Sequence, residues 1–526
     1  MSKPNILLIL SDDLGYSDIG CYGGEAQTPN LDKLAENGLR FTQFYTSARC
    51  CPSRASLLTG LHPHQAGVGH MTFEDYGLDG YHGDLNFQCV TIAEVLRSSG
   101  YSTYMSGKWH VTRFEKPEEP KHNWPCQRGF DHFYGIITGA SSYFNPCTLT
   151  RGNEPVKIPD REYYITDAIS DEMCKFLTDH DEKQPDHPFF AYLSYTAPHW
   201  PLHALSEDIE RYVGHFDMGW DSLREKRYER MVKTGIIDEH WKLSHDSTVP
   251  EWDKEKHKLW QTRRMEVYAA QIDRMDQGIG RVVQTLQETH NLDNTVIFFL
   301  SDNGACAEEL DERFKRFVGK FATVKTHDGR EVCFRKDPSI MPGSEDTYQS
   351  YGLPWANVSN TPFREYKHWV HEGGIATPLI VYWPDGIKAR SELRRQIGQL
   401  PDIMATCLDI ARAKYPTEFN GHPIHPLEGH SLKPLFENKA NDKEILYFEH
   451  EGNRAIRKEK WKLVCKYPGP WELYDMKQDG TEMSNLVGRH PSVVKKLSKL
   501  YDEWAIRSNV LPWDEVKKKR LAHAGV

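Results

Sequence analysis

The sequence predicts an α/β protein with a large, mostly parallel sheet flanked by helices, followed by a small antiparallel sheet and one helix at the C-terminal end. Three observations predict it. Continuous apolar runs alternate with helical segments through the first four hundred residues, one segment carries an apolar stripe at helical spacing, and short β-like runs follow after about residue 440. Alternating strands and helices are typical of parallel sheets covered on both faces.

Four apolar runs are predicted to be buried strands of the central sheet, because such runs are typical of strands covered on both faces. They span residues 5–10, 103–106, 189–195 and 296–300. A polar cluster follows each run, in order Ser11-Asp12-Asp13, Gly107-Lys108-Trp109-His110, Thr196-Ala197-Pro198-His199 and Ser301-Asp302-Asn303-Gly304. Ligands of open α/β sheets bind beyond the carboxyl ends of the strands, so the four clusters predict one common site.

Helices are predicted between these strands. Residues 30–37 follow Thr28-Pro29 and stop at Gly38, and residues 91–99 stop at Gly100, which are start and stop signals of helices. A longer helix carries a single apolar stripe, made of Met265, Tyr268, Ile272, Met275, Ile279, Val282 and Leu286. We interpret this stripe as core packing, without a chemical role.

Two long insertions and a C-terminal subdomain are expected to extend the core. The insertions, residues 202–261 and 305–360, are expected to rim a pocket, since long irregular stretches inside a compact domain are usually functional or disordered. The β-like runs and the final helix of the subdomain lie at 445–448, 454–456, 461–465, 471–474 and 492–506. The predicted division is a catalytic domain over residues 1–440 and an α+β subdomain over residues 441–526.

Composition excludes several classes of protein. The chain has 526 residues, a formal net charge of -10 and no apolar run that approaches the ~18 residues of a membrane span. An acidic chain lacks the basic surface that nucleic acids require, so we expect neither a nucleic-acid partner nor a membrane span. Eleven scattered cysteines without zinc-type CxxC pairs predict mostly reduced thiols. The apolar stretch at the N-terminus is too short for a signal peptide, which predicts a cytoplasmic protein, or a periplasmic or secreted one if a signal was removed.

Residues 46–60, TSARCCPSRASLLTG, carry the most particular pattern in the chain. Pro52 suits the first turn of a helix, so Cys50 is predicted at a helix N-terminus, which favours negative charge. A structural cysteine pair or an ordinary reactive thiol is the alternative. The spacing C-x-P-S-R resembles the signature of type I sulfatases of the alkaline phosphatase superfamily, whose first cysteine becomes Cα-formylglycine. The resemblance implies that Cys50, and not Cys51, is modified, and that Arg54 anchors it.

Asp12-Asp13 and Asp302-Asn303 offer three carboxylates and one amide oxygen from two strand ends. Taken singly, an Asp pair after a strand is more often a helix cap or a turn. Oxygen ligands suit a hard cation, whereas zinc draws His or Cys. Both segments resemble the metal-binding segments of sulfatases. The resemblance implies one Ca²⁺ (or Mg²⁺) bound by Asp12, Asp13, Asp302 and Asn303, with the hydrated formylglycine at Cys50 as the fifth ligand.

Four further residues are candidates for catalysis. On local sequence alone, Lys108 could be a surface lysine and His110 a core histidine. The segment GKWH nevertheless resembles a sulfatase element whose lysine contacts sulfate and formylglycine and whose histidine supports it. His199 in TAPHWP resembles the histidine that reaches the leaving-group oxygen, and Lys367 in YKHWVHEGG resembles a lysine that contacts sulfate.

The resemblance also implies a separate catalytic role for each of these groups. The hydrated aldehyde offers one hydroxyl that attacks sulfur and a second hydroxyl that an ordinary serine or cysteine lacks. Lys108 and Lys367 neutralise charge on the sulfate. His199 protonates the leaving oxygen, and His110 accepts a proton as sulfate is released.

The resemblance covers almost the whole chain and is closest to bacterial arylsulfatases, through residues 59–71 and 363–384. It implies hydrolysis of aryl or carbohydrate sulfate monoesters, with a formylglycine-generating or anaerobic sulfatase-maturating enzyme as partner. A phosphonate monoester or phosphodiester hydrolase on the same scaffold is one alternative, and a catalytically silent protein that binds sulfated glycans is another. Tyr143, His70 and Trp200 could line a sugar-binding pocket by stacking, although a core or surface role fits each one separately.

Overall fold

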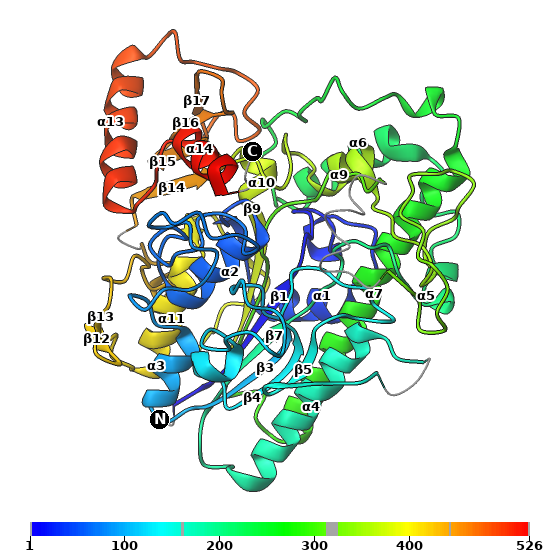
Figure 1. Ribbon diagram of the computed structural model, residues 1–526. Coiled ribbons are helices and arrows are strands. Elements are labelled where there is room, and N and C mark those ends of the chain that lie inside the picture. Colours follow the sequence, from blue (N-terminus) through cyan, green and yellow to red (C-terminus); the bar gives the residue numbers. More distant parts are fainter. Residues whose placement is uncertain (1–2, 159–161, 312–323, 441–442, 524–526) are drawn as a thin grey trace.

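The protein is described by a computed structural model over residues 3–158, 162–311, 324–440 and 443–523. Within these ranges, eleven strands form one sheet in the spatial order β10-β2-β9-β8-β1-β7-β3-β4-β5-β6, with β11 beside β2 (Figure 1). The strands are β1 (Asn5–Ser11), β2 (Leu39–Tyr45), β3 (Ser102–Lys108), β4 (His132–Ile136), β5 (Leu149–Arg151), β6 (Glu154–Pro155), β7 (Phe189–Ser194), β8 (Thr295–Ser301), β9 (Ala376–Tyr382), β10 (Glu392–Arg394) and β11 (Gly398–Gln399). The predicted α/β class is confirmed.

The four apolar runs of the sequence are neighbours in the sheet. β8, β1, β7 and β3 pair in parallel, and every residue of these strands is buried. Successive residues of β1 enter different hydrophobic clusters, with Leu7 and Ile9 in one and Ile6, Leu8 and Leu10 in the other. Because both faces are covered, β1, β7 and β8 carry consecutive apolar side chains instead of alternating apolar and polar ones, as over residues 6–10 and 296–300.

Helices cover the sheet on both faces (Figure 1). The cluster of Leu7 contains side chains of α1 (Pro29–Glu36), α4 (Ile165–Lys183) and α7 (Lys258–Glu288). The cluster of Leu8 contains side chains of α2 (Cys50–Thr59), α3 (Ile92–Ser98) and α11 (Pro401–Ala411). The predicted helices therefore form within one or two residues of the expected bounds. Thr91 begins α3 with a capping box, in which its side chain and that of Glu94 each accept a hydrogen bond from the other's backbone N–H.

Two parts of the central domain add detail that the sequence did not predict. β9 lies between β2 and β8 and is antiparallel to both, so the sheet is mostly but not wholly parallel. The first insertion is largely helical, with α5 (Ser206–Glu210), α6 (Gly219–Lys233), the 3₁₀ turn Trp252–Lys254 and the first turn of α7. The second insertion contains α9 (Gly352–Ser359), and its residues 312–323 lie outside the described ranges. The short elements that complete the domain are the 3₁₀ turns Gly20–Tyr22 and Pro125–Arg128, α10 (Glu372–Ile375), α12 (Lys433–Phe436) and the pair β12 (Glu418–Phe419) and β13 (His422–Pro423).

The C-terminal part is the predicted antiparallel sheet with a helix. Its strands pair in chain order, β14 (Ile445–His450), β15 (Asn453–Lys458), β16 (Trp461–Cys465) and β17 (Trp471–Asp475). α13 (Pro491–Arg507) packs on them, and α14 (Trp513–His523) is a further helix that the sequence did not predict. The division at residue 440 stays a prediction, and residues 441–442 lie outside the described ranges. Among the described helices, none combines the length and apolarity needed to cross a bilayer.

Buried ions join the C-terminal sheet to the central domain. Lys462 on β16 is fully buried, and its Nζ lies 2.7 Å from a carboxylate oxygen of both Glu372 and Glu482. Glu372 is the first residue of α10, and its N–H donates to Glu482 at 2.8 Å. Burial alone would raise the pKa of Glu482, but the Lys462 ammonium, together with His371 and the hydrogen bonds to the carboxylate, lowers this pKa. Lys462 therefore ties the small sheet to the segment that follows the Lys367 loop.

We expect Lys462→Met to lower the free energy of unfolding by about 3–5 kcal/mol, because two buried carboxylates then lose their shared cation. Urea denaturation followed by fluorescence measures the loss. The matched control is Lys460→Met, which removes a half-exposed pair with Asp475 and is expected to cost less than about 1 kcal/mol. Equal losses in the two variants would contradict the structural role of Lys462.

Candidate active site

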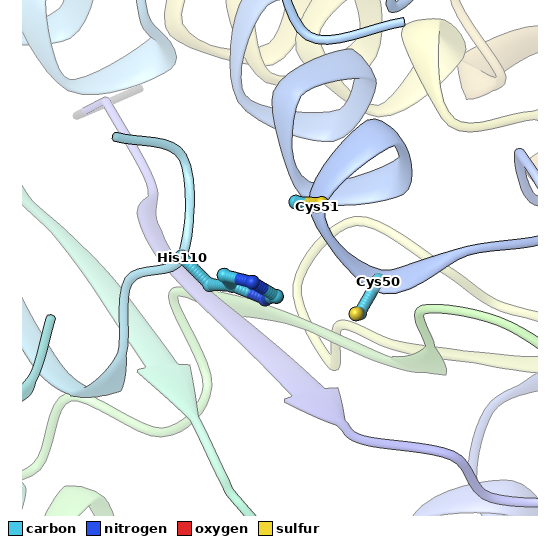
Figure 2. A group of neighbouring side chains, drawn as sticks. All are labelled: Cys50, Cys51 and His110. Atoms are coloured by element: carbon cyan, nitrogen blue, oxygen red, sulfur yellow. The ribbon is translucent and has the colours of Figure 1, made fainter. Parts of the chain in front are cut away.

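Cys50 is the first residue of α2, after Arg49 in an extended conformation. All ten residues of this helix are buried, and Gly60 ends it with a φ of 68°, where a residue with a Cβ is strained. The free N–H groups at the start of a helix carry partial positive charge. Figure 2 shows the Cys50 side chain and the His110 ring turned toward each other, with Cys51 one residue further into the helix.

The two adjacent cysteines differ in their electrostatic environment. Contact with the neighbouring Cys51 thiol, aided by Lys108 and Lys367 and opposed by burial, lowers the pKa of Cys50 well below its usual range. Burial and the same contact raise the pKa of Cys51 well above its usual range. Cys50 is therefore the thiolate of the pair, which is the reactive form of cysteine.

The acidic candidates lie together at the ends of β1 and β8. These strands pair in parallel with Ser11 opposite Ser301, so the residues that follow them must meet. The backbone N–H of Asp13 donates to Asp302 at 3.2 Å, and the Asn303 side-chain amide donates to the Asp13 carboxylate at 2.7 Å. All four predicted oxygen donors, Asp12, Asp13, Asp302 and Asn303, are essentially inaccessible to solvent.

This donor set fits a divalent cation. Asp12 Oδ1 and Asn303 Oδ1 are buried without a hydrogen-bond partner among the residues that the structure describes. Burial raises the pKa of Asp12, and burial together with the neighbouring Asp12 raises the pKa of Asp302 to about 7. Buried carboxylates that repel one another and unpaired oxygen acceptors both favour a bound cation with oxygen ligands.

Three buried cationic side chains surround the carboxylates, each from a different element. Arg54 of α2 lies 2.8 Å from Asp302, and Lys108 at the end of β3 lies 2.5 Å from Asp12. Lys367, in the loop before α10, lies 2.8 Å from the second carboxylate of the N-terminal pair, Asp13. The site therefore combines places for a metal with cations that can hold a tetrahedral anion.

Two histidines complete the set of predicted residues. His110 follows β3, faces Cys50 and has its pKa lowered to about 4 by burial. His199 follows β7, and its Nδ1 donates to the carbonyl of Trp200 at 2.7 Å. Its Nε2 lies 3.3 Å from both Lys367 Nζ and Asp13 Oδ2, and burial is the largest of the effects that lower its pKa to about 4. The structure thus brings all the predicted site residues together.

Sequence reasoning did not single out Arg49 and Glu308, which lie beside this set. Their side chains form an ion pair at 2.7 Å, and the Trp200 indole also donates to Glu308 at 3.0 Å. Burial opposes a low pKa at Glu308, but Arg49 and Lys367 outweigh it and lower this pKa. The only sequence feature that could have located Arg49 is its position directly before the cysteine motif. Glu308 lies in the irregular second insertion, which carries none.

The three aromatic or histidine candidates for sugar stacking occupy different environments. Tyr143 is buried, and its hydroxyl donates to the carbonyls of Thr196 and His199, so it holds the loop of His199 in place. His70 is also buried. Trp200 alone is partly exposed, with its ring centroid 4.2 Å from that of His199. Trp200 is therefore the one of the three placed to contact a substrate.

Taken together, the sheet edge, the oxygen donors and the buried lysines define a metal-dependent hydrolase of the esters of a tetrahedral oxyanion. Residues 4–413 match the family model described as Sulfatase, and residues 364–505 match the model described as N-sulphoglucosamine sulphohydrolase, C-terminal. The chain belongs to the sulfatase family. The predicted resemblance to type I sulfatases is confirmed.

Individual relatives agree with this assignment. The chain is 32% identical over 541 residues to an uncharacterised sulfatase of Schizosaccharomyces pombe, covering 96% of this chain and 93% of the relative. It is 33% identical over 455 residues to the arylsulfatase of Klebsiella aerogenes, covering 82% and 92%. The crystal structure of Ps i-CgsB, also solved in complex with k-i-k-neocarrahexaose, has a TM-score of 0.68 and 25% identity, covering 96% and 93%. The protein is a sulfuric ester hydrolase.

Proposed function

We propose that the protein hydrolyses sulfate monoesters through a formylglycine made from Cys50, with one Ca²⁺ bound by Asp12, Asp13, Asp302 and Asn303. The observation that carries the proposal is the position of Cys50, which lies at a helix N-terminus against buried lysines and oxygen donors. When present, the hydrated formylglycine supplies an attacking hydroxyl and a second hydroxyl, and Ca²⁺ supplies positive charge at the sulfate. Every other role falls to side chains of the chain itself.

The cationic side chains hold and orient the substrate. Lys108 and Lys367 both lie near the Cys50 position. Each is paired with an aspartate, and the sulfate oxygens would replace these aspartates as partners of the two lysines. Arg54 bonds Asp302, the backbone carbonyl of Lys108 and the Ser194 hydroxyl, so it fixes the carboxylate and the strand end beside residue 50.

The two histidines would move protons at different steps. Since Nδ1 of His199 donates to a carbonyl, its Nε2 is the atom left to exchange a proton with the leaving oxygen. A bound sulfate brings negative charge beside this ring and favours its protonated form. His110 faces residue 50 with a buried, neutral ring, which suits a proton acceptor during sulfate release.

We propose an aryl or carbohydrate sulfate as the substrate and place carbohydrate sulfates first. The arylsulfatase of Klebsiella aerogenes supports the aryl class. The C-terminal family model and the oligosaccharide complex of Ps i-CgsB support the carbohydrate class. Screening a panel of sulfated monosaccharides beside nitrophenyl sulfate and phenyl phosphonate tests this proposal. Sulfate esters should be cleaved faster than the phosphonate, and the reverse order would overturn it.

The partner that makes formylglycine is proposed to act before the chain folds. Cys50 is only 2% exposed and lies within a helix that is buried along its whole length, so a second enzyme cannot reach it in the folded protein. A formylglycine-generating enzyme or an anaerobic sulfatase-maturating enzyme would supply the modification.

For the metal, we expect one Ca²⁺ per chain and at least about tenfold weaker binding in Asp302→Asn, because affinity depends on the number of charged ligands. Isothermal titration of chelator-treated protein measures both quantities. Asp385→Asn is the matched control, since Asp385 is an exposed aspartate away from the site. Unchanged Ca²⁺ affinity in Asp302→Asn would show that the cation lies elsewhere.

A further inference from the structure

A second group of ionisable side chains lies outside the proposed catalytic residues. His368, His450 and Glu451 each offer one ligand atom, and these three atoms lie within 4.8 Å of one another. We call these three residues, together with His70, the histidine cluster. Its members come from the segment after α2, from the loop before α10 and from the turn between β14 and β15. Segments more than three hundred residues apart thus converge on one carboxylate.

The backbone at two cluster residues adopts conformations that need an explanation. Glu451 and Gly452 form the two-residue turn of the hairpin, with φ values of 52° and 83°. Turns with two positive φ angles favour Asn, Asp or Gly, so turn formation does not explain a glutamate at 451. His368 has a φ of 91°, and its N–H donates to the carbonyl of Ala48 at 2.7 Å. Such conformations in residues with a Cβ concentrate at functional sites.

Contacts with two histidines hold the Glu451 carboxylate in place. One oxygen lies 2.5 Å from Nε2 of His70, and the other lies 3.1 Å from Nδ1 of His368. The Tyr76 hydroxyl lies 3.1 Å from Nδ1 of His70, which leaves the His70 proton on the nitrogen that faces the carboxylate. These contacts orient the Glu451 carboxylate, in the same way that outer hydrogen-bond partners orient the ligands of metal sites.

His450 is the member of the histidine cluster whose ring nitrogens lack hydrogen-bond partners. Its side chain is fully buried, and neither ring nitrogen has a hydrogen-bond partner among the residues that the structure describes. A buried polar atom left without a partner is destabilising. The ring lies between those of His70 and His368, with centroid distances of 5.9 Å and 5.4 Å. Burial lowers the pKa of His450 well below its usual range, so the ring is neutral, the form that ligates metals.

We propose that His368, His450 and Glu451 bind one Zn²⁺, a site separate from the oxygen-only site of the sulfatase reaction. Two imidazoles and a carboxylate suit zinc, whereas Ca²⁺ prefers oxygen ligands alone. The 3.1 Å between His368 and Glu451 is close to the ~3.3 Å edge of a zinc tetrahedron built from Zn–N bonds of about 2.0–2.1 Å. Binding at Nδ1 of His368 requires the neutral tautomer with its proton on Nε2, so the ring proton moves from one nitrogen to the other and none is lost.

The surroundings of the cluster are compatible with a bound ion. The side chains of His368 and Glu451 are 26% and 25% exposed, which gives an ion access from solvent. Arg49 brings a positive charge near His450, but its ion pair with Glu308 offsets the repulsion that this charge would exert on a cation. Three protein ligands leave a fourth position for water. The ion would link the β14–β15 turn to the loop of Lys367, because its ligand His368 directly follows Lys367 in the sequence.

The test titrates the mature, Ca²⁺-loaded enzyme with Co²⁺ and then with Zn²⁺. We expect one equivalent of Co²⁺ with the visible absorption of a tetrahedral site and without a thiolate charge-transfer band, which distinguishes it from binding at Cys51. Excess Ca²⁺ should not displace the ion, and Zn²⁺ should displace it. Metal content after gel filtration gives the stoichiometry independently of activity.

Variants locate the site. His450→Ala and Glu451→Gln should each lose the bound Co²⁺, and His70→Ala should weaken binding by about 10–100-fold. His430→Ala, which removes an exposed histidine, should bind as the unaltered protein does. Glu451→Gln keeps the shape of the turn residue. Without zinc, the variant and the unaltered protein should therefore unfold at the same temperature. With zinc, only the unaltered protein should be stabilised. Retention of one tetrahedral Co²⁺ in Glu451→Gln, or no Co²⁺ uptake by the unaltered protein, overturns the proposal.

Discussion

Replacing Cys50 by alanine is expected to reduce sulfate ester hydrolysis by at least about 10⁴-fold, the scale seen when a catalytic nucleophile is removed. Cys51→Ser is expected to keep most of the activity. The physical reason is the contrast between the two thiols, since Lys108 and Lys367 help to lower the pKa of Cys50, whereas burial raises the pKa of Cys51. Steady-state rates on nitrophenyl sulfate measure both variants.

The Cys50→Ala variant should still bind one Ca²⁺, because its four oxygen donors lie on other elements. This control separates loss of the nucleophile from loss of the fold. Comparable activity losses in the Cys50 and Cys51 variants would mean that the motif acts through structure and not through one modified residue.

Replacing His199 by alanine is expected to slow cleavage of alkyl or sugar sulfates by roughly 10²–10⁴-fold, the usual contribution of a general acid. Nitrophenyl sulfate should be affected much less, because nitrophenolate leaves without needing a proton. The position of Nε2, 3.3 Å from Lys367 Nζ, places the nitrogen of His199 that does not donate to a carbonyl beside a cation proposed to hold sulfate. Rates on a series of leaving groups measure the effect as a slope.

His110→Ala provides the matched control for this experiment. Because His110 faces residue 50, its loss should slow sulfate release to the same extent for good and poor leaving groups. If His199→Ala also lowers all rates equally, another residue must protonate the leaving group.

The core of the fold could be predicted from the sequence because its strands are buried on both faces. Residues 6–10 and 296–300 are apolar at every position, so they could only be buried elements. The predicted helices have start and stop signals within one or two residues of the observed ends. β9 could not be oriented from sequence, because its direction follows from the connection through α10 and not from its own residues.

The candidate site could be predicted to the extent that its residues follow strands. Asp13 and His199 follow β1 and β7, Lys108 is the last residue of β3, and the carboxyl ends of parallel strands meet at one edge. Lys367 and Glu308 lie in loops, where no periodic pattern fixes their positions. The resemblance located Lys367, but nothing in the sequence located Glu308.

The histidine cluster shows a further limit of sequence reasoning. His70 was singled out as an aromatic candidate for sugar stacking, yet it contacts Glu451 from the C-terminal sheet. Contacts between the two parts of the chain depend on how the small sheet docks, and no local pattern specifies that docking. Such sites become visible only in three dimensions.

The central claim is that residue 50 of the active protein is formylglycine. Trypsin cleaves after Arg49 and Arg54, so it releases residues 50–54 as one peptide, CCPSR. Mass spectrometry of this peptide from catalytically active protein tests the claim directly. The account predicts an aldehyde at position 50, reactive toward hydrazines, and an intact thiol at position 51. Fully active protein that contains only unmodified Cys50 would contradict it.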